Sequence, residues 1–155
     1  MMRTPIDLPM AELVPHGGRM RLLDAALDGD EESLRACVEI RSDSLFFDGD
    51  GVGAWVGIEY MAQAVAAWAG WRARLAGGAP KVGFLLGSRR FSTSRARFLL
   101  GEVLTVETHR QFQADNGLGQ FDCSLLIAGE QVAKASLTVF EPENVSQFLR
   151  KREDV

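Results

Sequence analysis

The longest hydrophobic pattern in the chain has the helical period and covers about residues 57–75, with the sequence GIEYMAQAVAAWAGWRARL. Apolar residues almost encircle this segment, which is the pattern of a helix that is buried on all sides. Gly77, Gly78 and Pro80 follow it and are typical of a helix end. We therefore expect one long helix in the middle of the chain, enclosed by the rest of the protein.

Strands are predicted on both sides of this helix, because apolar and polar residues alternate there with period two. Before the helix, residues 20–28 and 33–41 predict two short strands joined by an acidic turn at residues 29–32. A Gly/Asp-rich loop at residues 48–53 has the composition of a turn. The other expected elements are strands at residues 82–91, 102–114, 119–129 and 131–140, a hairpin turn at Ala128, Gly129 and Glu130, and a short surface helix at residues 143–151.

This order of elements predicts an α+β domain in which an antiparallel sheet curls around one long central helix. Such a sheet is the simplest way to bury every side of the helix. The sequence has no internal repeat and no linker long enough to divide it, so residues 1–155 are expected to form a single domain.

Composition narrows the class of protein further. Hydrophobic residues make up 46% of the chain, which is enough for a real core. No apolar run reaches the roughly 18 residues that a membrane span needs, and Asp7 and Glu12 lie where a signal peptide would be apolar. These features predict a cytoplasmic protein without a membrane span. Because the sequence shows no metal-ligand cluster, phosphate loop or Ser/His/Asp arrangement, we expect no metal and no other cofactor.

Charge is distributed unevenly along the chain. The net charge of −4 argues against nucleic acid as a partner. Between Tyr60 and Gly101, however, there are seven basic residues and no acidic one, and this bias could create a local field for an anionic partner. The same residues could also be scattered over a solvated surface, and both interpretations stay open.

Glu59 is the one carboxylate in the predicted helix. A negative charge is favoured in the first turn by the helix dipole and by unpaired backbone N–H groups, so a purely structural role would explain it. Its neighbours also allow a chemical role. Gln63 lies one turn further on and could hold the carboxylate or a water molecule. Gly57 and Ala54 are small enough to let a ligand approach the backbone amides at the helix start.

The segment GIEYMAQAVAAWAG resembles the central helix of hotdog-fold 3-hydroxyacyl-(acyl-carrier-protein) dehydratases, whose signature is Glu-x-Met-Ala-Gln. LVPHGGRMRLLD at residues 13–24 aligns with the family's LLPHRxPFLLVD. Further similar segments follow in the same order: KVGFLLGSRRF, FLLGEVLTVE with its G-[DE]-x-L element, and GLGQFDCSLLIAGEQVAKASLTVF with its V-A-x-A element. The resemblance spans roughly residues 13–140. It implies a hotdog fold, a homo-oligomer that is a dimer or a multiple of dimers, and an acyl thioester substrate on acyl carrier protein or coenzyme A.

One family element is missing. These dehydratases normally carry a catalytic His in a G-H-F-P-G loop before the helix. Here the stretch FFDGDGVGAWVGIE at residues 46–59 is shorter, contains no histidine and offers Asp48 or Asp50 instead. A compact loop of this kind resembles the dehydratase-like proteins of aryl polyene pigment pathways.

The resemblance implies a mechanism with two groups, in which a neutral His removes the C2 proton of a 3-hydroxyacyl thioester and Glu59 protonates the leaving C3 hydroxyl. The chain has two histidines. His109 lies in a strand far from any matched motif and is expected to be an exposed or packing residue. His16, in the PHGGRM turn, could order the N-terminal segment by bonding a backbone carbonyl. It could instead reach toward a Glu59, including the Glu59 of another subunit, and act as the base.

Aromatic and basic residues supply candidate contacts to the substrate. Phe47 and Trp55 flank the helix start and could wall a tunnel for an acyl chain, although aromatic residues at such positions are often part of the core. The phosphate of a pantetheine arm, or an acidic carrier protein, could be bound by four arginines of the basic segment, Arg89, Arg90, Arg95 and Arg97.

The favoured function is therefore the dehydration of a 3-hydroxyacyl thioester to the trans-2-enoyl thioester, in synthesis of the fatty-acid or polyene type. The missing loop histidine keeps two alternatives open. One is a hotdog acyl thioesterase in which Glu59 activates water. The other is a non-catalytic acyl-binding or partner subunit.

Overall fold

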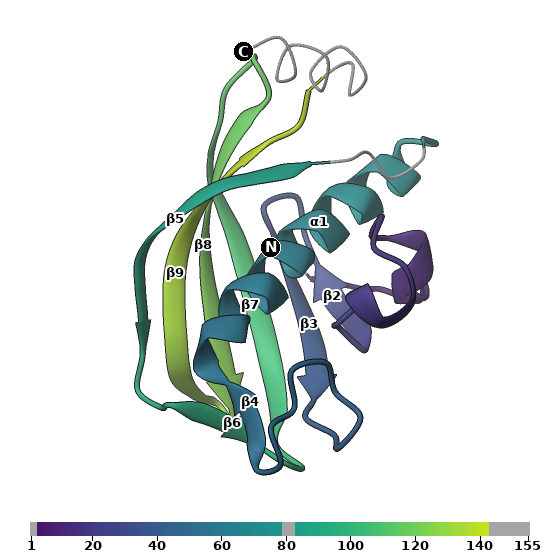
Figure 1. Cartoon of the computed structure of the whole chain (residues 1–155). Coiled ribbons are helices and arrows are strands. Elements are labelled where there is room, and N and C mark those ends of the chain that lie inside the picture. The colour runs from purple at the N-terminus through teal and green to yellow at the C-terminus, as the bar shows by residue number, and fades with distance from the viewer. Residues whose placement is uncertain (1–2, 79–82, 143–155) are drawn as a thin grey trace, which may run out of the picture.

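An antiparallel sheet and one long helix make up most of the structure, a computed structural model that describes residues 3–78 and 83–142. The seven strands are ordered β1-β2-β3-β7-β8-β9-β5, and helix α1 lies against the face around which the sheet curls (Figure 1). This is the predicted hotdog arrangement. The strands are β1 (Thr4–Pro5), β2 (Ala25–Gly29), β3 (Ser33–Glu39), β5 (Phe84–Thr93), β7 (Val103–Gln113), β8 (Leu118–Ile127) and β9 (Glu130–Phe140).

Helix α1 has the predicted bounds, Gly57–Leu75. A short 3-10 helix, η3 (Ala54–Val56), leads directly into it. The C-terminal end of α1 is formed by Gly77, whose φ of 85° is favourable for glycine. This conformation allows the amide of Gly78 to donate to the carbonyl of Ala73 at 2.8 Å. Among the described residues, no helix is both long and apolar enough to cross a membrane.

One face of α1 is packed and the other is not. Met61, Ala64 and Ala67 are completely buried, whereas Ala62, Ala66 and Ala69 are only half-buried. The prediction that the helix is enclosed on all sides was therefore wrong for the described chain. The physical reason is that the sheet covers one side of α1, while alanines on another side are too small to fill the space beside them.

The segment before β2 also differs from its prediction. The expected strand at residues 20–28 begins only at Ala25, and Gly18–Met20 forms the 3-10 helix η2 instead. The backbone here bonds to a helix side chain rather than to a strand: the amide of Leu22 donates to Gln63 Oε1 at 2.8 Å, and Gln63 Nε2 donates to the carbonyl of Met20 at 2.7 Å. A further 3-10 helix, η1 (Met10–Glu12), precedes this segment.

The loop before α1 contains a strand that the sequence did not indicate. Residues Gly51–Gly53 form β4, which pairs with β6 (Arg97–Leu99) in a separate two-stranded sheet. Glycine at position 51 is required because a Cβ there would overlap the carbonyl oxygen of Phe98. The surface helix expected at residues 143–151 lies outside the described residues.

Candidate active site

A cavity of about 260 Å³ lies along the half-buried face of α1. The helix supplies Glu59 in its first turn and, further along, Ala62, Ala66 and Ala69. These positions are three or four residues apart, so they share one face of the helix. The opposite wall comes mainly from apolar residues of β5, β8 and β9, namely Phe84, Leu85, Phe121, Val139 and Phe140. Two acidic residues, Glu59 and Glu141, therefore line a mostly apolar space.

His16 lines the same cavity. His16 and Glu59 of the same chain thus line one cavity, and the approach of His16 to Glu59 stays a prediction. Nδ1 of His16 is buried, and it has no hydrogen-bond partner among the described residues. Buried polar atoms are normally satisfied, so this ring nitrogen is available to a ligand or to a water molecule. The Nε of Arg21 bonds the carbonyl oxygen of His16 at 3.3 Å and leaves the ring unengaged.

The N-terminal segment is fastened along α1 and so determines where His16 lies. Near the helix end, Arg74 Nε donates to the carbonyl of Glu12 at 3.2 Å. Next, the carbonyl of Leu13 lies so close to Gly70 that a Cβ at position 70 would overlap it. Towards the helix start, Gln63 binds the backbone on both sides of Arg21. The segment thus runs antiparallel to the helix, and His16 lies between these anchors.

Three comparisons place the chain among known proteins. The model of the ApeP-like family, described as ApeP dehydratase, matches residues 8–150. The chain belongs to the ApeP-like family. This confirms the resemblance to dehydratase-like proteins of aryl polyene pathways and the assignment to the dehydratases, which are lyases.

Solved structures share the fold of this ApeP-like chain. The chain is similar to a protein in the dehydratase heterocomplex ApeI:P from Xenorhabdus doucetiae, with 25% identity, a TM-score of 0.87, and coverage of 94% of this chain and 97% of that one. It also shares its fold with a hypothetical thioesterase protein bound to coenzyme A from Streptococcus pneumoniae (18% identity, TM-score 0.59, covering 76% and 84%). The PaaI protein of E. coli has the same fold (13% identity, TM-score 0.59, covering 76% and 78%). Comparison with curated protein sequences gives no significant match.

Gln63 of this ApeP-like chain has a role that the sequence did not predict. It was expected to hold Glu59 or a water molecule, but its side chain is only 1% exposed and both of its polar atoms bind the backbone of the N-terminal segment. Gln63 therefore anchors the segment that carries His16. The position of Gln63 one turn after Glu59 indicated that the two side chains are close. Its hydrogen-bond partners, Leu22 and Met20, are 41 and 43 residues away in the sequence and could not be inferred from that position.

The other residues expected at the helix start lie outside the cavity wall. The Ala54 amide already donates to the carbonyl of Ala96 at 3.0 Å, and Gly57 is packed closely against Leu125. Phe47 is half-buried against the core. Trp55 is 62% exposed and packs edge-to-face on Phe46, with ring centroids 5.2 Å apart. Their predicted contact with substrate has no support from this cavity.

Asp48 is an unsuitable replacement for the missing loop histidine. Its carboxylate accepts from the amides of Asp50 and Gly51 and from Arg97, which is 2.6 Å away. The hydrogen bond from Arg97, followed by those from the two amides, lowers the pKa of Asp48 to about 2. Neither Asp48 nor Asp50 is among the described residues that line the cavity. Of the groups that were considered as the second catalytic residue, His16 is the one that the cavity contains.

The four arginines predicted to bind a carrier are not one patch. Arg97 pairs with Asp48, and Arg95 pairs with Glu102 at 2.7 Å, so their charges are matched within the protein. Arg89 and Arg90 line a separate polar hollow of the sheet together with Lys134. The basic segment is therefore divided: the charges of Arg95 and Arg97 are matched by carboxylates, and Arg89 and Arg90 lie apart from them on β5.

Proposed function

We propose that this chain dehydrates a 3-hydroxyacyl thioester to a trans-2-enoyl thioester in the cavity beside α1. The observation that carries the proposal is that Glu59 and His16 line the same apolar cavity in a chain of the ApeP-like dehydratase family. A thioester acyl chain needs an apolar space, and its reacting carbons need a proton donor and a proton acceptor.

The two groups divide the reaction between them. The imidazole of His16 takes the proton from C2, and the C2–H electron pair forms the C2=C3 double bond. The C3–O bond breaks as Glu59 gives its proton to the hydroxyl, which leaves as water. The unpartnered Nδ1 of His16 leaves that ring without a competing hydrogen bond from the described residues.

The functional unit is proposed to contain a second protein chain. The similar protein from Xenorhabdus doucetiae is part of a heterocomplex, and β5 of this chain forms an edge of the sheet with Leu85 and Leu86 exposed. An edge strand with exposed apolar residues is suited to pairing with another chain. Either a related dehydratase subunit or a second copy of this chain could pair there.

Acyl carrier protein is the proposed carrier of the substrate. Within the described residues, Arg89 and Arg90 make no side-chain ion pair or hydrogen bond, so they could bind an acidic protein surface or a phosphate. Coenzyme A, which presents phosphate groups as well, is the alternative carrier. A preference for carrier protein that is lost in the Arg89→Ala/Arg90→Ala double variant, but not in Arg72→Ala, would support this part.

The experiment follows the easier reverse reaction, hydration of a trans-2-enoyl thioester, using the full chain alone and together with its co-purified partner. Loss of enoyl absorbance without release of free thiol supports the proposal. Thiol release without loss of the double bond would identify a thioesterase. If neither preparation loses the double bond or releases thiol, the chain is a non-catalytic subunit.

Two histidine variants give the matched control. His16→Ala should abolish hydration, whereas His109→Ala should not, because His109 is exposed on β7 and outside the cavity wall. Equal activity of both variants would remove His16 from the mechanism.

A further inference from the structure

Trp68 lines the cavity and lies on the same helix as Glu59. It is nine residues further along the helix, which corresponds to about 13 Å at 1.5 Å per residue. The indole is 7% exposed and packs edge-to-face on Phe121, with ring centroids 5.5 Å apart. Both rings line the cavity. Together they form an aromatic wall of the cavity about 13 Å along the helix axis from Glu59.

Polar contacts fix the indole of Trp68 in this aromatic wall. The indole Nε1 of Trp68 donates to the carbonyl of Asp30 at 3.3 Å, and the guanidinium of Arg110 lies 5.0 Å from the centroid of the indole. Arg110 is held in turn by two hydrogen bonds of 2.9 Å to the carboxylate of Glu32. Trp68 is therefore fixed on its polar edge as well as on its face.

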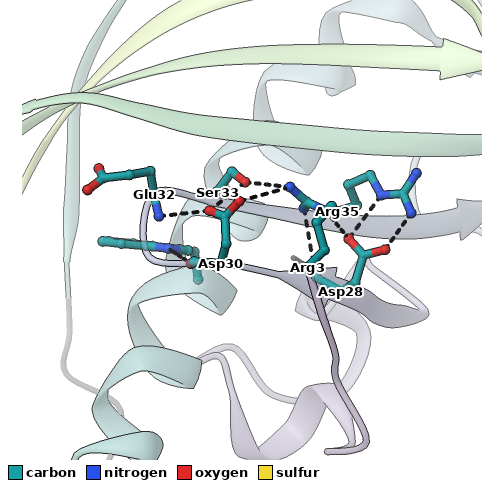
Figure 2. A network of polar contacts seen from close by, with 7 residues as sticks. Arg3, Asp28, Asp30, Glu32, Ser33 and Arg35 are labelled. Atoms are coloured by element: carbon teal, nitrogen blue, oxygen red, sulfur yellow. Dashed lines mark hydrogen bonds and ion pairs between the residues drawn. The ribbon is translucent and has the colours of Figure 1, made fainter. Parts of the chain in front are cut away.

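The turn that receives Trp68 is itself braced. Figure 2 shows Asp30 accepting hydrogen bonds from the amide of Glu32 and from Ser33, both at 2.9 Å, with Arg3 reaching the same group of residues. The hydrogen bonds from Glu32 and Ser33 help to lower the pKa of Asp30 against the opposing effect of its burial. Asp30 binds Trp68 and Glu32 binds Arg110. A rotation of the indole would therefore disturb the turn between β2 and β3.

The cavity is small. Its volume of about 260 Å³ lies below the range of roughly 300–1,000 Å³ that is usual for pockets of drug-sized ligands. Alanines at positions 62, 66 and 69 provide the width on the helix side. A slender, unbranched chain fits this volume better than a bulky group does.

We propose that Trp68, supported by Phe121, determines substrate specificity by limiting the length of the acyl chain. The inference rests on the proposed function for its choice of ligand. An extended chain advances about 3.5 Å for every three bonds, so the distance from Glu59 to Trp68 accommodates at most roughly a dozen bonds. The substrate class is a medium-length, unbranched acyl thioester, and longer chains meet the indole.

The test is calorimetric binding of a homologous series of saturated acyl-pantetheine thioesters to the full chain, free or in its co-purified complex. Affinity should rise about fourfold with each added methylene until the cavity is full, and then stop rising. Trp68→Phe should move this limit to a longer chain. The first ligand that is too long for the wild type by two methylenes should then bind about 15-fold more tightly to the variant.

Two further variants keep the test decisive if Trp68→Phe folds poorly. Ala66→Leu fills the cavity from the helix side and should move the limit to a shorter chain. Trp71→Phe is the matched control, because Trp71 is a buried tryptophan of the same helix that is not among the cavity-lining residues described. Its limit should equal that of the wild type.

The outcomes separate this inference from the proposed reaction. A length limit that shifts with Trp68 and Ala66 supports the inference even if no thioester is hydrated, and absence of hydration would then contradict the proposed function alone. Three results would overturn the inference. The affinity could rise with chain length without a limit, Trp71→Phe could move the limit as much as Trp68→Phe does, or no member of the series could bind.

Discussion

The two faces of helix α1 are built from similar residues but differ in packing. On the packed face, Met61, Ala64 and Ala67 have no exposed surface and lie against the sheet. On the cavity face, Ala62 and Ala66 are half-buried and border empty space. Larger side chains there could fill that space, and filling cavities commonly stabilises proteins. The comparison shows that alanine packs against the sheet on one face and borders a cavity on the other.

The largest expected effect is on activity alone, from the cavity face. Glu59→Gln should lower enoyl thioester hydration by about 10²–10⁴-fold, because the amide cannot donate or accept the proton as the carboxyl group does. The free energy of unfolding should change by no more than about 0.5 kcal/mol, since Glu59 is exposed. Urea denaturation beside the hydration assay measures both quantities. A variant that keeps its activity would remove Glu59 from the reaction.

The packed face should give a large effect on stability. Met61→Ala deletes a fully buried side chain and should lower the free energy of unfolding by about 2–5 kcal/mol. The matched change on the cavity face, Ala62→Ser, should cost much less. If the two substitutions destabilise the protein equally, the distinction between the two faces fails.

Gln63 connects the two faces and should affect both properties. Gln63→Leu leaves the amide of Leu22 and the carbonyl of Met20 without their partner, at about 1–3 kcal/mol for a buried group. Hydration should also fall, because the segment that carries His16 loses one of its anchors. The exposed Gln111 supplies the control, and Gln111→Leu should change neither urea midpoint nor rate. Full activity of Gln63→Leu at unchanged stability would show that the N-terminal segment is held by other contacts.

The smallest expected effect is a loss of stability in acid, far from the cavity. The hydrogen bond from Arg35, with help from Arg3, lowers the pKa of Asp28 to about 2, although burial opposes this. Because the folded-state pKa is below the ordinary value of 3.8, the contribution is present above about pH 4 and is lost as the pH falls towards 2. We expect it to be about 1–2 kcal/mol after allowance for the partly exposed arginines.

Asp28→Asn should remove that part of the acid dependence. The measurement is the urea midpoint between neutral pH and pH 2 for both proteins. Identical pH profiles would show that the ion pairs of Asp28 do not contribute to stability.

Much of the fold could be predicted because periodicity is a local property. The helical period gave the bounds of α1, and period-two alternation located β3 and β7–β9 to within a few residues. The strand β4 could not be predicted, because Gly51 and Gly53 are typical turn residues and pair only because β6 lies beside them.

The candidate site was predictable only in part. Glu59 and His16 stood out through the family motifs, and the cavity contains both. The hydrogen-bond partners of Gln63 could not be predicted, because they are distant from it in the sequence. The ion pairs of Arg95 and Arg97 could not be predicted either, because the charges alone gave no indication of the pairing. The aromatic wall at Trp68 had no local signal, because its contacts come from β8, β7 and the turn after β2.

The most direct test of the central claim is a crystal structure of the chain, in its co-purified complex, with a non-hydrolysable amide analogue of a 3-hydroxyacyl-pantetheine. We predict that the acyl chain lies between α1 and strands β5 and β9, with its C3 hydroxyl about 2.6–3.2 Å from the carboxylate of Glu59. An analogue bound elsewhere, with the cavity beside α1 empty, would contradict the account.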